Sequence, residues 1–187
     1  MKIGIIGIGI INMEYAHRAA KLGYEVLISH TKETNCWKEV IENMGANVKL
    51  VDIYDAAIAE IILLSVDWED LESSISHLPD MSKKLILHTN NPIFNFECST
   101  SSLPIIIEKS SAEKIASLLP DAHVVKIFNK LQPSTIYGKN KEKNYGETDF
   151  FYMVKDQNVQ NKVISFLSAL DFSSLALTTV IKIDSRN

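Results

Sequence analysis

The sequence predicts an α/β fold in which a doubly wound, mostly parallel sheet carries helices on both faces. Short apolar runs rich in Ile and Val alternate with amphipathic stretches of helical length, which is the pattern of repeated strand and helix units. The runs are apolar at nearly every position, as expected for parallel strands that are covered on both faces. A length of 187 residues suits a single domain over 1–187, and we expect a core over 1–130 and a short strand-helix extension over 131–187.

Each apolar run is expected to form one strand. The core runs lie at 2–6, 25–29, 48–51, 60–65, 84–88 and 123–127, and a further strand is expected at 150–154. Helices are expected at 12–22, 34–44, 68–77 and 110–119, followed by a turn of helix near Pro133, a helix at 157–169 and a short extended tail. Gly23 and Gly45 follow the first two helices, where a residue free to take positive φ ends a helix. Ser110 with Glu113 three residues later has the pattern of a capping box, so Ser110 is expected to begin its helix.

The composition argues against several classes of protein. The net charge is −4 and the pI is near 5.7, whereas a protein that neutralises nucleic-acid phosphates needs a basic face. Cys36 and Cys98 are too few for a disulfide framework or a zinc site, and they fit a reducing compartment. No apolar run approaches the roughly 20 residues that cross a bilayer. We therefore expect a cytoplasmic protein with no nucleic-acid partner, no membrane partner and no metal.

The main chemical signal is the turn Gly7-Ile8-Gly9-Ile10-Ile11-Asn12, between the first strand and the first helix. In the dinucleotide fingerprint of Rossmann folds, the first glycine allows the sharp turn and the second lets the backbone approach a pyrophosphate at the helix N-terminus. Gly7 and Gly9 meet these two requirements. The third position, normally Gly or Ala for close packing, is Asn12. The alternative is a tight structural turn with no ligand.

The end of the second strand indicates which dinucleotide is preferred. An NAD-binding fold places an acid there to bind the ribose 2′-hydroxyl, but this chain has Ser29-His30-Thr31-Lys32. Hydroxyl, imidazole and ammonium groups suit a 2′-phosphate, which a carboxylate would repel. NADP(H) is therefore favoured over NAD(H). Two alternatives stay open: Glu33 as a ribose ligand at the end of a longer strand, and a solvated loop.

Several motifs occur together in one order along the chain. They are Met1-Lys2-Ile3-Gly4-Ile5-Ile6-Gly7-Ile8-Gly9, Leu64-Ser65-Val66-Asp67-Trp68, Asn91-Pro92, and Ser110-Ser111-Ala112-Glu113 through Leu119-Pro120 to Val125-Lys126-Ile127-Phe128-Asn129. Over roughly residues 1–170 the chain resembles the NADPH-dependent deazaflavin (coenzyme F-420) reductase family of NADP oxidoreductases. The resemblance implies a Rossmann fold, usually dimeric, that passes a hydride between NADP(H) and a flat acceptor such as a deazaflavin or flavin.

The resemblance also implies which residues meet the cofactor. Gly7, Ile8, Gly9, Ile10 and Ile11 are expected at the phosphates, Ser29, His30, Thr31 and Lys32 at the 2′-phosphate, and Ser65, Val66 and Trp68 at the nicotinamide half, with Asn91 and Pro92 also included. The chain departs from the family pattern at Ile10, Asn12 and Asp67, and it lacks the family's Gly-Pro-Leu segment near the C-terminus. Glu14 adds a negative charge near the helix start, and it would oppose pyrophosphate binding if it pointed that way.

Hydride transfer to a deazaflavin needs mainly proximity and alignment, so no acid-base dyad is required. His88, at the end of the fifth strand, is the candidate proton donor for a carbonyl or imine substrate. Three functions remain open. The first is an NADP(H)-dependent oxidoreductase acting on a flat acceptor. The second is a catalytically silent NADP(H)-binding or sensor protein, and the third is a reductase of a small carbonyl or imine compound.

Overall fold

The computed structural model describes residues 1–30, 35–90, 103–129, 150–153, 156–172 and 174–176. In chain order its elements are β1 (Lys2–Ile6), α1 (Ile10–Lys21), β2 (Glu25–Ser29), α2 (Asn35–Glu42), β3 (Val48–Leu50), α3 (Ile53–Ala56), β4 (Ile61–Leu64), α4 (Leu71–Ile75), β5 (Leu85–His88), α5 (Leu103–Leu118), β6 (His123–Asn129), β7 (Phe150–Met153), α7 (Gln157–Ala169) and β8 (Ser174–Ala176). Within these ranges, no helix is both long and apolar enough to cross a membrane.

The sheet has the order β3-β2-β1-β4-β5-β6-β7-β8. Strands β1 to β6 run parallel, β7 pairs antiparallel with β6, and β8 pairs parallel with β7. The order reverses direction at β1, so the carboxyl ends of β1 and β4 lie next to each other at a topological switch point. The predicted Rossmann-type fold is confirmed, and ligands of such sheets bind at this switch point.

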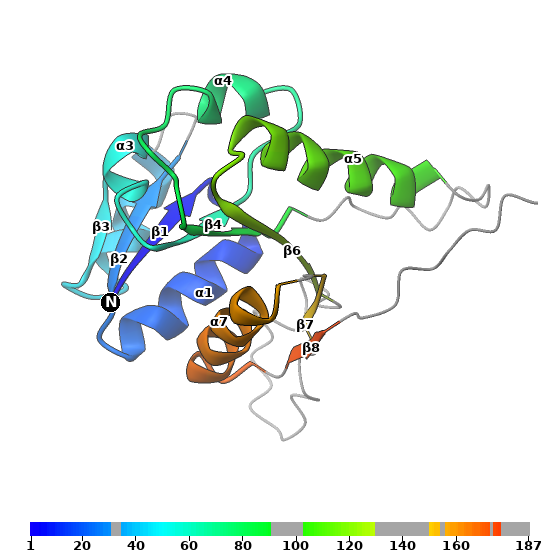
Figure 1. The fold of residues 1–187 in the computed structure, drawn as a ribbon. Coiled ribbons are helices and arrows are strands. Elements are labelled where there is room, and N and C mark those ends of the chain that lie inside the picture. Colours follow the sequence, from blue (N-terminus) through cyan, green and yellow to red (C-terminus); the bar gives the residue numbers. More distant parts are fainter. Residues whose placement is uncertain (31–34, 91–102, 130–149, 154–155, 173, 177–187) are drawn as a thin grey trace, which may run out of the picture.

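Helices cover both faces of the sheet. In Figure 1, α1 and α7 lie on one side of the sheet and α3, α4 and α5 lie on the other. Successive strand residues alternate between two buried clusters: Ile5, Ile28 and Leu63 pack with α1, α2 and α7, whereas Ile6 and Leu64 pack with α3, α4 and α5. This alternation explains why the strand runs are apolar at nearly every position.

The extension packs onto the core through aromatic and charged contacts. The Tyr15 ring of α1 lies 6.2 Å from the Phe166 ring and 5.0 Å from the Phe172 ring, measured between centroids. Arg18 Nη1 donates to the carbonyl oxygens of Leu170 at 3.2 Å and Asp171 at 2.7 Å, just after α7 ends. Helix α1, which begins at the glycine turn, is therefore packed against α7.

The predicted elements agree with the structure except at a few ends. The predicted helix at 157–169 has the bounds of α7, and the predicted strands differ from the observed ones by no more than two residues at either end. The capping box at Ser110 was wrong, because α5 already begins at Leu103 and Ser110 lies inside it. Two elements were missed: α3, a single turn capped by the Asp52 carboxylate, and β8, expected only as an extended tail. The turn near Pro133 lies outside the described residues.

Candidate functional site

The glycine turn is held by the ends of two neighbouring strands. Gly7 has φ of 91°, a left-handed conformation that favours glycine. Its N–H donates to the carbonyl oxygen of Ser29 at the end of β2, 2.9 Å away. A Cβ on Gly7 would lie 1.7 Å from the carbonyl oxygen of Ser65, directly after β4. No other residue type fits this position without moving the backbone.

The turn presents the N-terminus of α1 without a side-chain cap. Gly9 is the N-cap in extended conformation, no side chain accepts a hydrogen bond at this cap, and the first turn contains no acidic residue. A Cβ on Gly9 would meet nothing closer than Ser65 Oγ at 3.6 Å. Free N–H groups and the helix dipole favour an anion at such a helix start. The arrangement fits the pyrophosphate of a dinucleotide.

Asn12, the departure from the fingerprint, is a buried structural residue. Its side chain is fully buried, and its Nδ2 donates to the carbonyl oxygen of Gly7 at 2.9 Å. Its Oδ1 accepts a hydrogen bond from Thr89 Oγ1 at 2.6 Å. Asn12 is therefore enclosed in the interior by these two partners, and its side chain does not occupy the surface at the helix start.

Glu14 does not oppose an anion in the way that the sequence allowed. Its Oε1 lies 2.7 Å from Arg18 Nε, one helical turn further along α1. The Arg18 guanidinium lies 3.9 Å from the centre of the Phe172 ring. The Glu14 carboxylate is thus directed toward the extension and is neutralised there.

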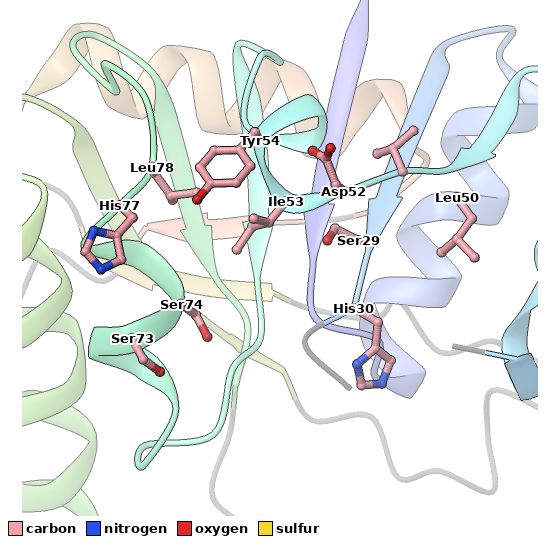
Figure 2. A pocket seen from close by; sticks show the side chains of 11 residues that line it. Ser29, His30, Leu50, Asp52, Ile53, Tyr54, Ser73, Ser74, His77 and Leu78 are labelled. Atoms are coloured by element: carbon pink, nitrogen blue, oxygen red, sulfur yellow. The ribbon is translucent and has the colours of Figure 1, made fainter. Parts of the chain in front are cut away.

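A pocket of about 450 Å³ lies at the end of β2. It is lined by Ser29, His30, Leu50, Val51, Asp52, Ile53, Tyr54, Ser73, Ser74, His77 and Leu78, which come from the ends of β2 and β3, from α3 and from α4 with the residues that follow it (Figure 2). Val51 N–H donates to the carbonyl oxygen of Ile28, which keeps the chain after β3 beside the end of β2. The pocket therefore adjoins the glycine turn, whose Gly7 N–H is bonded to Ser29.

The sequence identified only part of this pocket. Ser29 and His30 were predicted site residues and line it. Asp52 and His77 were not predicted as site residues, but the fold brings both into the pocket wall. The sequence does not show that the strand order places α3 and the residues around the end of α4 beside the end of β2. Thr31, Lys32, Asn91 and Pro92, the other predicted cofactor residues, lie outside the described residues.

The predicted nicotinamide residues follow β4 and differ in accessibility. Ser65 lies against Gly7, and its N–H donates to the carbonyl oxygen of Ile6 at 2.8 Å. Val66 is buried in the core, so only its backbone is available, and its carbonyl oxygen accepts from Asn90 Nδ2 at 3.1 Å. Trp68 is 47% exposed, and Lys114 Nζ lies 5.0 Å from the centre of its ring.

His88, the candidate proton donor, is buried and held neutral. Its side chain is enclosed, with Nε2 lying 3.1 Å from Ser111 Oγ and Nδ1 lying 3.5 Å from the carbonyl oxygen of Leu64. Burial, together with the charge of Lys126, lowers the pKa of His88 from 6.5 to about 4. A neutral imidazole in these contacts is not a proton donor near neutral pH. The structure thus argues against that role.

Metal-binding clusters are absent from the described part of the chain, in which no three His, Cys, Asp or Glu side chains come together in a way that could hold an ion. The candidate site consists instead of the glycine turn, the pocket at the end of β2, and the segment after β4. These three features lie along one edge of the sheet, at the carboxyl ends of the parallel strands.

The sequence matches a known protein-family model. Residues 2–92 match the family described as NADP oxidoreductase, coenzyme F420-dependent. The resemblance stated from the sequence is confirmed over these residues, which hold the glycine turn, the pocket and the segment after β4. None of the curated proteins matches the chain.

Solved structures share the fold at low sequence identity. A hypothetical protein from Sinorhizobium meliloti has a TM-score of 0.73 at 22% identity, and the match covers 95% of this chain and 84% of that one. A protein from Arthrobacter sp. FB24, provisionally assigned as an F420-dependent NADP-reductase, also gives 0.73, at 21% identity and with the same coverage. An imine reductase from Aspergillus terreus, in complex with NADPH4 and dibenz[c,e]azepine, gives 0.66 at 16% identity; the match covers 94% of this chain but 54% of that one.

Proposed function

Since residues 2–92 match the coenzyme F420-dependent NADP oxidoreductases, we propose that this chain is an NADP(H)-dependent oxidoreductase that transfers a hydride between NADP(H) and a flat acceptor such as a deazaflavin or flavin. The family match and the fold support an NAD(P)-dependent oxidoreductase. The observation that most supports the proposal is the N-terminus of α1, which directly follows Gly7 and Gly9 and has no side-chain cap. It offers backbone N–H groups and a positive helix end to a pyrophosphate.

The adenosine half is assigned to the pocket at the end of β2. Its volume of about 450 Å³ suits an adenine and its ribose. Tyr54, Ile53 and Leu78 provide apolar surface for a base, and Ser29 and His30 provide polar groups beside it. The pocket lies at the end of β2, beside the end of β1 that leads into the glycine turn, so one molecule can reach both.

The preference for a 2′-phosphate is the most detailed part of this proposal. Two charged residues have opposite effects on it. Lys32 favours a phosphate on sequence grounds, whereas the Asp52 carboxylate in the pocket wall disfavours one. Asp52 also accepts a hydrogen bond from the Asp55 N–H at 2.8 Å and so caps α3. We propose that Lys32 outweighs Asp52 because the Asp52 charge is shared with the helix start.

The nicotinamide half is assigned to the segment after β4. Ser65 lies beside the glycine turn, and Trp68 and Lys114 provide an exposed ring and a cation nearby. When bound, NADPH supplies the hydride, and the protein positions it. Because the pKa of His88 is lowered and its ring is enclosed, we assign no protein proton donor, which hydride transfer to a flat acceptor does not require.

The alternative is a protein that binds NADP(H) without catalysing a reaction, and the structure removes one of the arguments for it. The departures from the family pattern at Asn12, at Asp67 and in the C-terminal segment favour this alternative. Asn12, however, is buried and bonded to Gly7 and Thr89, which leaves the helix start open. Reduction of a small carbonyl or imine remains a weaker candidate, because the chain spans about half the length of the imine reductases that it resembles in fold and His88 does not suit the donor role.

Calorimetric titration of the nucleotide-free protein with NADPH and with NADH tests the proposal. We expect micromolar NADPH affinity and weaker NADH binding. Lys32→Ala should reduce the ratio of NADPH affinity to NADH affinity. Asp52→Asn, which keeps a helix-capping side chain, should increase this ratio by about ten-fold. NADPH oxidation is then followed with deazaflavin and flavin acceptors. If neither nucleotide binds, the proposal is wrong; if NADPH binds but no acceptor is reduced, the binding protein is the better description.

A further inference from the structure

The residue that breaks the dinucleotide fingerprint also joins the glycine turn to the centre of the sheet. Asn12 Nδ2 donates to the carbonyl oxygen of Gly7 at 2.9 Å, and Thr89 Oγ1, directly after β5, donates to Asn12 Oδ1 at 2.6 Å. Thr89 is itself fixed, because its N–H donates to the carbonyl oxygen of Leu64 at 3.0 Å. Both side chains are buried, at 0% and 2% exposed.

We propose that the Asn12–Thr89 bridge, defined as these two side-chain hydrogen bonds, holds the glycine turn in its phosphate-binding conformation. Asn12 is thus a positioning residue that acts through the Gly7 carbonyl. The inference rests on the proposed function for the identity of the ligand. The preformed shape of the turn can be tested without any ligand.

The two contacts use both ends of the Asn12 amide. Nδ2 donates to a carbonyl while Oδ1 accepts from a hydroxyl, so the side chain must present a donor and an acceptor at the same time. Aspartate has no donor for the Gly7 carbonyl, and alanine has neither group. Because the site is buried, a lost partner leaves a polar group without solvent to replace it.

The bridge adds a restraint that the rest of the turn lacks. The Gly7 N–H is held by Ser29 on β2, and the Gly7 Cα lies against the Ser65 backbone after β4. Only the Asn12 side chain ties the described turn to the residue after β5. A third glycine, as in the usual fingerprint, would pack closely but would make no such bond. The bridge therefore replaces close packing with hydrogen bonding.

The first measurement is hydrogen exchange of nucleotide-free protein over residues 7–13. The variants are Asn12→Ala, Asn12→Asp and Thr89→Val, with Thr89→Ser as the matched control that keeps the hydroxyl. We expect exchange about ten-fold faster in the first three variants and near the wild-type rate in Thr89→Ser. Circular dichroism confirms that each variant is folded at the temperature used.

The second measurement is NADPH affinity by calorimetry on the same folded variants. We expect affinity about ten-fold weaker for Asn12→Ala and Thr89→Val, with the double variant no weaker than the worse single variant because both act through one bridge. A role confined to stability would lower the melting temperature and leave both affinity and local exchange unchanged, and additive losses would also overturn the proposal. If the wild type binds no dinucleotide, the proposed function fails, whereas unchanged exchange in Asn12→Ala disproves the bridge itself.

Discussion

Gly7 and Gly9 lie two positions apart in one turn, yet they are constrained by different parts of the structure. Gly7 has positive φ, and the Ser65 backbone leaves no space for a side chain. Gly9 has φ of −140°, which any residue can adopt, and open space where a Cβ would lie. The first glycine is thus required by the fold, whereas the second leaves open the space that we propose for the pyrophosphate.

Alanine substitution should separate these two roles. Gly7→Ala should lower the free energy of unfolding by roughly 2 kcal/mol or more and abolish dinucleotide binding. Gly9→Ala should cost less than about 1 kcal/mol and still weaken NADPH binding, because its methyl group enters the space of the pyrophosphate. Urea unfolding measures the change in stability, and calorimetry measures the change in NADPH affinity. Normal NADPH affinity in Gly9→Ala would place the pyrophosphate elsewhere.

His88 shows how burial changes the role expected of a residue from its position. It stands at a strand end where catalytic groups of α/β sheets occur, but its ring is enclosed beside Ser111 and near Lys126. Desolvation disfavours the charged form. The residue therefore contributes to the core as a neutral, hydrogen-bonded side chain.

The lowered pKa of His88 predicts a dependence of stability on pH. The unfolded chain binds a proton with the ordinary pKa of 6.5, whereas folded His88 does so only at about 4. Between these values the unfolded state holds more protons, so the contribution is complete above pH 6.5 and is lost as the pH falls to 4, by about 3 kcal/mol in total.

Urea unfolding at several pH values between 4 and 7.5 measures this pH dependence of stability in the wild type and in His88→Gln. The His88 contribution should be absent in the variant. NMR titration of the imidazole gives the midpoint directly. A midpoint near 6.5 would contradict the burial argument. His88→Gln should also leave the pH dependence of NADPH oxidation unchanged between pH 6 and 8.

At the scale of elements, α1 is the component that links the site to the extension. Its N-terminal end forms the helix start at the glycine turn, and further along it Tyr15 and Arg18 lie against α7 and the residues after it. Arg18 stabilises the C-terminal end of α7 by donating hydrogen bonds to the carbonyl oxygens of Leu170 and Asp171, which directly follow the helix. Glu14 orients the guanidinium and is neutralised by it.

Arg18→Ala should therefore lower the free energy of unfolding by about 2 kcal/mol, through lost charged hydrogen bonds and the lost contact with Phe172. Hydrogen exchange should accelerate in α7. Lys21→Ala on the same helix is the matched control, because Lys21 is exposed, and it should change stability by less than about 0.5 kcal/mol. Equal effects of the two substitutions would show that the Arg18 contacts do not hold the extension.

At the scale of the molecule, the three parts of the proposed site belong to separate strand ends that the sheet brings to one edge. The turn follows β1, the pocket follows β2 and β3, and the nicotinamide segment follows β4. A dinucleotide that contacts all three would bind only the folded chain. Its binding should therefore stabilise the molecule as a whole.

We expect NADPH at about one hundred times its dissociation constant to add about 2.7 kcal/mol of stability. For a chain of this length the melting temperature should rise by about 5–10 °C. Differential scanning calorimetry with and without NADPH measures the shift, and Gly7→Ala should show none. A similar rise in Gly7→Ala would mean that the nucleotide binds away from the turn.

The sequence by itself determined the features that depend on neighbouring residues. Apolar runs and amphipathic stretches predicted the order of strands and helices, and the bounds of α7 were predicted to the residue because its apolar positions and its Asp156 cap are local. The glycine turn was also found, since it needs two glycines between a strand and a helix. The single turn α3 was missed, because four residues are too few to show a helical period.

The tertiary structure alone decided the contacts between residues far apart in the chain. Asn12 and Thr89 are separated by 77 positions, and Arg18 and Leu170 by 152. Asn12 stands out in the sequence only as a departure from the fingerprint, because its partner Thr89 lies too far along the chain for a local pattern to show the contact. Asp52 and His77 joined the pocket only through the order of the strands. Local periodicity reports the conformation of the backbone, whereas the partner of a buried polar group is chosen by which strand ends the sheet places side by side.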